Sequence, residues 1–203
     1  MSVPRHLVLF VRAPMRGAVK SRLAADIGKG AALAFYRRTL HDVLWRLGRD
    51  LRWQTWLAVT PDSAARQPGI WPSVPRLQVI PQGHGDLGER MEAPLRTLPA
   101  GPVVIVGSDI PDIAPAHILQ AFDALGRHDM VFGPARDGGY WLVGAKRRPV
   151  PHGLFENVRW STGHALADTI AGLPASARVA MLDLLDDVDD GAGYAAWQAR
   201  PRP

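Results

Sequence analysis

A group of cations lies near the N-terminus, in the segment RAPMRGAVKSRLA at residues 12–24. Arg12, Arg16, Lys20 and Arg22 recur there at short intervals, directly after an apolar run. Guanidinium and ammonium groups beside the N–H groups of a strand-to-helix turn are well suited to holding a polyphosphate. The spacing matches neither the Walker A loop nor the glycine pattern of dinucleotide-binding folds. A solvated basic loop explains the spacing equally well.

Carboxylates follow the most apolar run of the chain, PVVIVG, in the segment GSDIPD at residues 107–112. Asp109 stands where the expected strand ends, with Asp112 beside it. Oxygen ligands of this kind suit Mg²⁺ or Mn²⁺, and Asp109 could reach a cation that bridges phosphates. A local turn in which Asp109 accepts backbone N–H donors accounts for the same residues.

A second acidic group lies near the C-terminus, where residues 182–190 contain five Asp. If the preceding apolar strand continues through this segment, Asp187 and Asp189 project to the same side of it. Both are then candidate ligands for a cation. Acidic runs are more commonly solvated, so a plain surface turn is the competing interpretation.

The segment DGGYW at residues 137–141 lies between two apolar runs. Gly138 and Gly139 allow a ligand to approach the backbone closely, while Asp137 offers a carboxylate and Tyr140 and Trp141 offer aromatic faces. A hairpin turn that requires positive φ explains the Asp-Gly-Gly sequence equally well.

The turn GDLGERM at residues 85–91 is a weaker candidate for contact with a nucleotide. The residues that would make this contact are Gly85, Asp86, Gly88 and Arg90. However, Asp86 followed three residues later by Glu89 is also a capping box at a helix N-terminus. The structural interpretation is the stronger one here.

Trp160 opens a further segment, WSTGH, at residues 160–164. Ser161 or Thr162 could cap the helix that follows. Trp160 would then form a wall of a binding site beside that helix N-terminus. Packing of Trp160 into the core is the simpler interpretation.

Strands and helices alternate along almost the whole chain. Apolar runs bounded by turn residues predict strands at residues 6–11, 54–60, 76–82, 102–109, 129–134, 140–145 and 179–185. Helical spacing of apolar residues predicts helices at 28–49, 87–98, 115–125, from 161 or 162 to 173, and 194–197. This alternation predicts one α/β domain over residues 1–203, with three layers and a mostly parallel central sheet. In such sheets ligands bind at the carboxyl ends of the strands.

The composition excludes several classes of site. Cysteine is absent, which removes disulfides, thiolate nucleophiles and Cys-bound zinc. No Gly-x-Ser-x-Gly motif or Ser/His/Asp pattern occurs, so we expect no covalent nucleophile. No apolar run approaches the ~20 residues that span a bilayer, and residues 6–11 are too short for a signal-peptide core. We therefore expect a cytoplasmic protein with no membrane span.

The charge is distributed unevenly. The formal net charge is +5 and the pI is about 10.2, which could indicate a nucleic-acid partner. The cations are scattered along the chain, however, and no nucleic-acid-binding motif is present. We expect no nucleic-acid partner, and instead a separation of cations and carboxylates around a nucleotide and its metal.

Several motifs together resemble one family. They are RAPMRGAVKSRLA, QGHGDLGERM, GSDIPD, GPARDGGYWLVG, WSTGHAL and DDVDD, in this order, and they span about residues 5–190. In this respect the chain resembles the rSAM/selenodomain-associated transferases, glycosyltransferase-like proteins with the nucleotide-diphospho-sugar transferase (GT-A) fold. Some of these motifs are shared with 2-phospholactate guanylyltransferases.

The resemblance implies roles for individual residues. Lys20 and Arg22, with Arg12, would bind the phosphates of the nucleotide, and the turn at residues 85–90 would lie near its base or ribose. Asp109 would be the principal metal ligand. The late Asp-x-Asp motif, Asp187-Val188-Asp189, matches a second metal carboxylate of related nucleotidyltransferases, but DGAGY replaces the rest of that motif. The choice between Asp187 and Asp189 stays open.

The resemblance therefore implies a metal-dependent transferase that uses a nucleotide-activated donor. We expect glycosyl transfer from a sugar nucleotide to a small acceptor, with Mg²⁺ or Mn²⁺ as cofactor. Lys20 and Arg22 would stabilise the leaving group, and Asp137 would act as general base or orient the acceptor. The alternatives are a nucleotidyltransferase that acts on a small phospho-acid and releases pyrophosphate, and a non-catalytic nucleotide-binding protein. A homodimer is compatible with the sequence.

Overall fold

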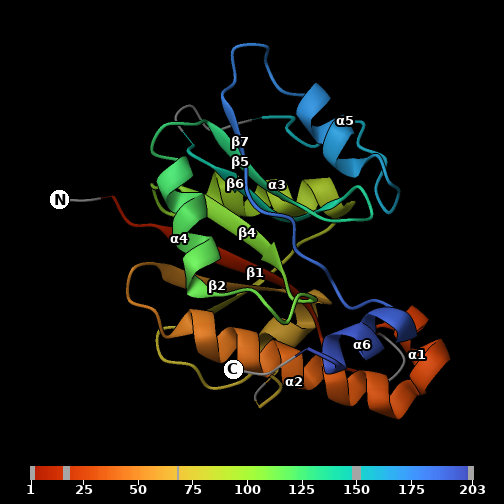
Figure 1. The fold of residues 1–203 in the computed structure, drawn as a ribbon. Helices are drawn as coiled ribbons and strands as arrows, with labels where there is room; N and C mark the ends of the chain where they lie inside the picture. The colour runs from red at the N-terminus through yellow and green to blue at the C-terminus, as the bar shows by residue number, and fades with distance from the viewer. Residues whose placement is uncertain (1–2, 16–18, 68, 148–151, 201–203) are drawn as a thin grey trace.

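A seven-stranded sheet runs through the centre of the computed structural model (Figure 1). The structure describes residues 3–15, 19–67, 69–147 and 152–200. The strands lie in the order β3-β2-β1-β4-β6-β5-β7. Their bounds are β1 His6–Arg12, β2 Gln54–Thr60, β3 Gln78–Pro81, β4 Val103–Gly107, β5 Met130–Pro134, β6 Tyr140–Ala145 and β7 Val179–Met181. Of the strands in the described residues, only β6 runs antiparallel to its neighbours, which confirms the predicted α/β class with a mostly parallel sheet.

Helices cover both faces of the sheet. Their bounds are α1 Ser21–Ile27, α2 Lys29–Gly48, α3 Leu87–Thr97, α4 Pro115–Ala124, α5 Ala165–Ala171 and α6 Gly191–Gln198, with a short 3₁₀ helix at Asp62–Arg66. On β1, Leu7 and Leu9 pack in the core that contains α2 and α4 residues. Val8 faces the opposite core, with Met91 of α3. Side chains of one strand thus alternate between two cores, which gives the predicted three layers.

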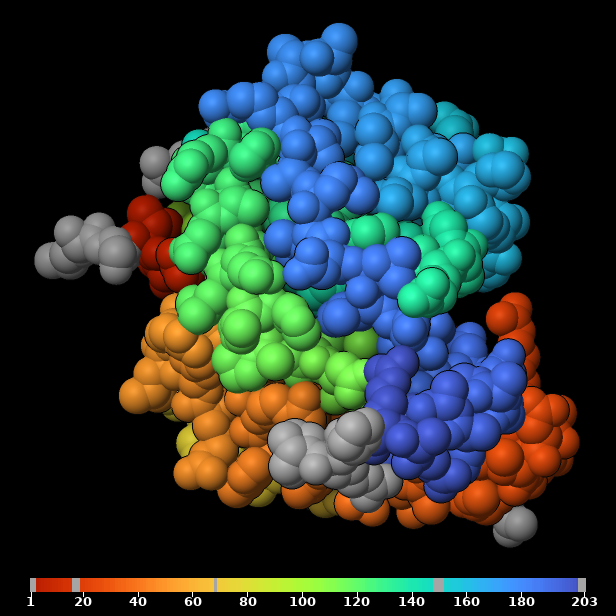
Figure 2. All heavy atoms as spheres, viewed as in Figure 1, coloured from red at the N-terminus to blue at the C-terminus, as the bar shows by residue number. Residues whose placement is uncertain are grey.

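Two predicted element boundaries were wrong near the charged segments. Residues 21–27 form helix α1, where we expected the basic loop to continue. The expected strand at residues 179–185 ends at Met181, so residues 182–190 are not a strand extension. These residues instead run across one face of the molecule to α6 (Figures 1 and 2).

A third, smaller core fixes this acidic segment. Val188 is buried with Leu23 of α1 and Phe35 of α2. Tyr194 and Trp197 of α6 pack edge-on against the Phe35 ring, with centroids 5.2 and 5.1 Å away. The Val188 N–H also donates to the Asp109 carbonyl oxygen, with 3.3 Å between nitrogen and oxygen. Burial and this hydrogen bond together hold Asp187 and Asp189 beside the end of β4.

The helix that follows the GDLG turn begins as its capping box predicts. The Asp86 carboxylate accepts the Glu89 N–H, and the Glu89 carboxylate accepts the Asp86 N–H, each at 2.9 Å. At α5 the expectation was wrong: neither Ser161 nor Thr162 is the cap, since α5 begins at Ala165. Within the described ranges, no helix has the length and apolar character needed to cross a membrane.

Gly144 of β6 occupies a position where the sheet has no room for a side chain. A Cβ atom at this position would lie 2.7 Å from Val131 Cγ1 and 3.1 Å from Val104 Cγ2. We expect Gly144→Ala to lower the free energy of unfolding by about 1–3 kcal/mol through overpacking, as measured by urea denaturation. The control is Gly30→Ala, at an exposed position of α2, where no atom lies within 4 Å of the added Cβ. A loss at Gly144 no larger than at Gly30 would contradict this account.

Candidate active site

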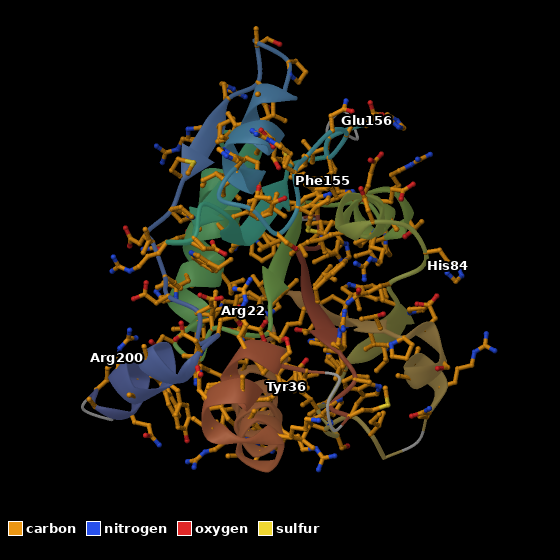
Figure 3. The ribbon with its side chains drawn as sticks, turned by 90° about the vertical axis from the view of Figure 1, so that its right-hand side faces the viewer. Arg22, Tyr36, His84, Phe155, Glu156 and Arg200 are labelled. Carbon is orange, nitrogen blue, oxygen red and sulfur yellow. The ribbon has the colours of Figure 1, made fainter. Side chains whose placement is uncertain are left out.

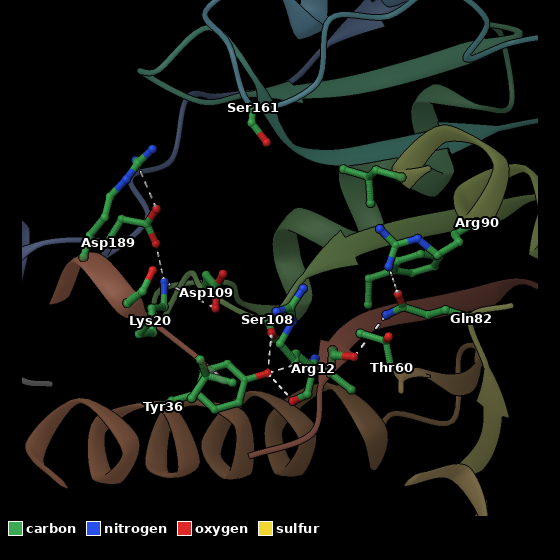
Figure 4. Close-up of a pocket in the computed structure, with 16 residues that line it drawn as sticks. Arg12, Lys20, Tyr36, Thr60, Gln82, Arg90, Ser108, Asp109, Ser161 and Asp189 are labelled. Carbon is green, nitrogen blue, oxygen red and sulfur yellow. Dashed lines mark hydrogen bonds and ion pairs between the residues drawn. The ribbon is translucent and has the colours of Figure 1, made fainter. Parts of the chain in front are cut away.

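Two adjoining pockets open where β1, β2 and β4 end and β6 begins. The first, here called the basic pocket, has a volume of ≈ 570 Å³ (Figure 4). The second, the aromatic pocket, has a volume of ≈ 400 Å³. Phe10, Leu87, Asp109 and Ser161 line both pockets. Asp109 is the only ionisable side chain that the two linings share among the described residues.

The structure brings most of the predicted site residues to these pockets. The basic pocket is lined by Arg12, Lys20, Arg22, Arg90, Asp109 and Asp189. The aromatic pocket is lined by Asp109, Asp137, Gly139, Tyr140, Trp141, Trp160 and Asp187. Arg16 of the predicted cationic group lies outside the described residues.

Lys20 is buried beneath the basic pocket, with 4% of its side chain exposed. Its ammonium Nζ lies 2.7 Å from Asp189 Oδ1 and 3.3 Å from Asp109 Oδ1 (Figure 4). The Lys20 backbone is left-handed, with φ 52° and ψ 52°, where it precedes α1. A residue other than glycine is uncommon in this conformation and is retained only where the surroundings enforce it. The backbone thus directs one ammonium group between two carboxylates that lie far apart in the sequence.

The carboxylates around Lys20 are electrostatically crowded. Burial raises the pKa of Asp109, although the Lys20 ammonium opposes this rise. Burial and the nearby Asp189 carboxylate raise the pKa of Asp187. Asp109 Oδ1 accepts no hydrogen bond from any residue that the structure describes, although Lys20 lies within ion-pair range. Two carboxyl groups with raised pKa values and one unsatisfied buried oxygen make this position attractive to a cation.

These residues fit a divalent cation that is held jointly by protein and ligand. Within the described chain, no three acidic or His side chains come close enough to form a metal site by themselves. Mg²⁺ is commonly bound by one or two carboxylates, with phosphate oxygens and water completing its shell. Asp109 with Asp187 or Asp189 could supply the protein ligands, provided that the Lys20 ammonium moves away.

Arg22 and Arg90 both line the basic pocket, but they are held very differently. Arg22 is 77% exposed, and its Nη1 lies 3.8 Å from Asp189 Oδ2. Figure 3 shows Arg22 on the side of the molecule where α1 and α2 meet the strand ends. Arg90 donates to the Asp86 carbonyl at 3.0 Å and to Gln82 Oε1 at 3.1 Å. Arg22 is thus free to adjust to a ligand, whereas Arg90 is held in place.

Sequence reasoning missed two residues that organise this pocket. The buried Gln82 amide donates to the carbonyl oxygens of Val11 and Ala58 and so holds its Oε1 toward Arg90. The Tyr36 hydroxyl accepts the Arg12 N–H and donates to the Arg12 carbonyl. Burial raises the pKa of Tyr36 to about 12, so this hydroxyl stays protonated. The only signal for Tyr36 was a hydroxyl within the apolar stripe of a helix.

Three of the four residues proposed for the GDLG turn have structural roles. Among the described residues, Gly85, Asp86 and Gly88 are not part of either pocket lining, whereas Arg90 is. The Asp86 carboxylate caps α3. Gly85 has φ +95°, and a Cβ on Gly88 would lie 2.6 Å from Phe155 Cβ and 3.0 Å from Trp160. The helix start therefore explains this turn, as the capping-box interpretation indicated.

The DGGYW segment forms the hairpin turn between β5 and β6. Asp137 Oδ1 accepts the Gly139 N–H at 2.9 Å, which fixes the carboxylate of a residue that lines the aromatic pocket. Gly138 has φ +81°, and a Cβ there would lie 2.2 Å from the Gly163 carbonyl oxygen. Gly138 is therefore required by the turn and by its close contact with the WSTGH loop. Of the two glycines in the turn, Gly139 lines the pocket and Gly138 does not.

Trp160 is half-buried and joins the pocket wall to the core. Its ring packs against Tyr140 and Phe155, with centroids 6.4 and 6.1 Å away. Arg159 holds the start of this loop through a two-pronged ion pair with the Asp168 carboxylate, with both contacts at 2.8 Å. Trp160 thus packs against the core, as the simpler interpretation holds, and it also lines the aromatic pocket. Its role as a wall of a binding site stays a prediction.

Residues 43–162 match the family described as "Uncharacterized protein conserved in bacteria (DUF2064)". The chain belongs to this family. None of the curated proteins matches the sequence.

Among solved structures, a similar one is a protein provisionally assigned as a nucleotide-diphospho-sugar transferase from Desulfovibrio desulfuricans G20. The two chains share 28% sequence identity and superpose with a TM-score of 0.82, over 92% of this chain and 82% of the other. This likeness confirms the predicted resemblance to nucleotide-diphospho-sugar transferases.

Two more distant structures show the same fold. The first is 4-diphosphocytidyl-2C-methyl-D-erythritol synthase from Anaerococcus prevotii DSM 20548, with 11% identity, a TM-score of 0.62, and coverage of 97% and 99%. The second is glucosyl-3-phosphoglycerate synthase from Mycobacterium tuberculosis, with 14% identity, a TM-score of 0.55, and coverage of 99% and 73%. This DUF2064 chain thus has the fold of a transferase-like enzyme, and two pockets open at the ends of its strands.

Proposed function

We propose that this DUF2064 protein transfers a glycosyl group from a sugar nucleotide to a hydroxyl group of a small acceptor, with the help of Mg²⁺ or Mn²⁺. The observation that carries the proposal is the position of Asp109 at the junction of the basic and aromatic pockets. A reaction between two substrates needs such a junction, because the reacting atoms must meet beside the groups that stabilise the charge.

The basic pocket suits the nucleotide diphosphate of the donor. Lys20, Arg22 and Arg12 bring cations to one pocket, and Arg90 faces them from α3. The structure of glucosyl-3-phosphoglycerate synthase, which shares this fold, contains Mn²⁺ and uridine diphosphate. This supports a nucleotide diphosphate as the ligand of the basic pocket and a divalent metal as its companion.

The aromatic pocket then receives the acceptor. In the transfer, the acceptor oxygen bonds to the anomeric carbon while the bond from that carbon to the diphosphate breaks. The diphosphate leaves with the electron pair, and Lys20 and Arg22 stabilise its negative charge. Asp137 takes the proton of the acceptor hydroxyl or orients that hydroxyl. A cation bound at Asp109, with Asp187 or Asp189, would neutralise the diphosphate.

The released product tests this proposal against nucleotidyl transfer. A structure with the same fold, CMP-2-keto-3-deoxy-manno-octonic acid synthetase, contains CTP, which keeps nucleotidyl transfer as the second candidate. We expect the purified protein with Mn²⁺ and a panel of sugar nucleotides to release nucleoside diphosphate in the presence of an acceptor. Chelation of the metal should stop the release. Pyrophosphate release from nucleoside triphosphates would instead support the second candidate, and no stabilisation by any nucleotide in a thermal-shift screen would contradict both.

A further inference from the structure

The aromatic pocket is lined by acidic side chains and, among the described residues, by no basic ones. Its acidic lining residues, among those that the structure describes, are the carboxylates Asp109, Asp137 and Asp187. No Lys, Arg or His side chain of the described residues belongs to the lining. Enzymes that bind phosphorylated or carboxylated acceptors need cations or backbone anion sites to hold them. The aromatic pocket thus presents carboxylates where such an acceptor would need positive charge.

Three cations near the pocket are already engaged with carboxylates. Lys20 pairs with Asp189 and lies beside Asp109 on the basic side. Arg159 forms its two-pronged ion pair with Asp168, as described above. Arg136, next to Asp137 in the hairpin, is paired with Asp186. These side chains would have to give up existing ion pairs before they could bind an anionic acceptor.

A bound divalent cation would not reverse the sign of this charge. When ionised, the three lining carboxylates carry three negative charges, and a divalent cation that displaces the Lys20 ammonium from Asp109 offsets two of them. The donor diphosphate brings further negative charge to the same junction. An anionic acceptor would therefore meet like charge at short range, which opposes its binding.

The walls of the pocket favour an apolar or aromatic face on the acceptor. Tyr140 and Trp160 form a T-shaped pair on one wall, and Met91 and Phe10 line the pocket from α3 and β1. Aromatic faces bind apolar groups and attract cations through their negative π faces. The side-chain donors of the described lining are the hydroxyls of Tyr140, Ser161 and Thr162 and the indole N–H groups of Trp141 and Trp160. These donors are neutral, so they leave the charge of an anion uncompensated.

We infer that the acceptor is an uncharged or cationic hydroxyl compound with an apolar or aromatic face, and that the pocket rejects phosphorylated and carboxylated acceptors. This inference rests on the proposed function, since it takes the aromatic pocket as the acceptor site. It goes beyond that function because it names the class of acceptor.

Three small probes with the same hydroxyphenyl skeleton test the inference. They are tyrosol, which is neutral, tyramine, which is cationic, and 4-hydroxyphenylacetate, which is anionic. Binding to the whole protein is measured by saturation-transfer NMR and calorimetry, with Mn²⁺ and uridine diphosphate present. We expect tyrosol and tyramine to bind at least about tenfold more tightly than 4-hydroxyphenylacetate. Equal or tighter binding of 4-hydroxyphenylacetate, or no binding of any of the three, would overturn the inference.

A charge variant locates the effect. Ala135 lines the aromatic pocket, so Ala135→Arg adds a cation there. This variant should bind 4-hydroxyphenylacetate more tightly and tyramine more weakly than the unaltered protein does. The matched control, Ala175→Arg, lies on an exposed turn and should leave both affinities unchanged. If Ala135→Arg does not fold, the order of affinities in the unaltered protein still decides the question.

The failure of this inference can be distinguished from the failure of the proposed function. Binding of uridine diphosphate with Mn²⁺ is measured separately, before any acceptor probe is added. Normal nucleotide binding together with a preference for the anionic probe would overturn only the acceptor class. If uridine diphosphate does not bind to the protein in the presence of Mn²⁺, the proposed function itself is overturned.

Discussion

Replacement of Asp109 by asparagine should abolish the metal-dependent part of nucleotide binding. The carboxylate lies at the junction of the two pockets, and its Oδ1 is buried without a hydrogen bond from the described residues. Asparagine keeps the shape of the side chain but removes the charge that a hard divalent cation requires. We expect Mn²⁺ to strengthen nucleotide binding to the unaltered protein and to have little effect on Asp109→Asn. Calorimetry with and without Mn²⁺ measures both.

The fold should survive this substitution, which separates a lost site from a misfolded protein. Burial raises the pKa of Asp109, so folding disfavours its ionised form relative to the unfolded chain. A neutral amide removes that cost, and we expect no loss of thermal stability in the absence of ligands. The control is Asp112→Asn, which removes a nearby, exposed carboxylate that pairs with Arg200. If Mn²⁺ strengthens nucleotide binding equally in Asp109→Asn and in the unaltered protein, the role assigned to Asp109 is contradicted.

The central sheet was predictable because its strands are apolar on both faces. In β4, Val103 to Val106 are all buried, and such a run has few alternatives to a covered parallel strand. Helix α1 was not predictable in the same way. It has seven residues and one buried side chain, Leu23, and it packs against α6 from the other end of the chain. Short helices depend on such distant packing more than on their own propensity.

The sequence predicts which charged residues belong to the site, but it does not predict how these residues are arranged around one another. Asp109 and Lys20 stood out because each follows an apolar strand and belongs to a recognisable motif. The pairing of Lys20 with Asp189 joins residues 169 positions apart, and no local pattern encodes it. Gln82 was missed because an amide that bonds two strand carbonyls and one Arg has no sequence signature. Its role follows only from the register of the strands around it.

Lys20→Met should produce two effects of opposite sign. The Lys20 ammonium lies between Asp109 and Asp189, where it neutralises carboxylates that could otherwise bind a cation. Its removal should strengthen the binding of Mn²⁺ to the ligand-free protein, because the competing positive charge is gone. The same change removes a cation that stabilises the departing diphosphate, so we expect kcat for nucleoside diphosphate release to fall about 10²–10³-fold.

The two effects separate an electrostatic role of Lys20 from a purely structural one. Methionine keeps an unbranched side chain, and it must adopt the same left-handed backbone conformation as Lys20. The backbone strain before α1 is therefore similar in Lys20→Met and in the unaltered protein. Free Mn²⁺ is measured by electron paramagnetic resonance, and turnover is measured by nucleoside diphosphate release. Lys29→Met, at an exposed position on α2, is the matched control and should change neither quantity. A structural role alone would weaken Mn²⁺ binding and turnover together, whereas competition for Asp109 requires that Mn²⁺ binding strengthens while turnover falls.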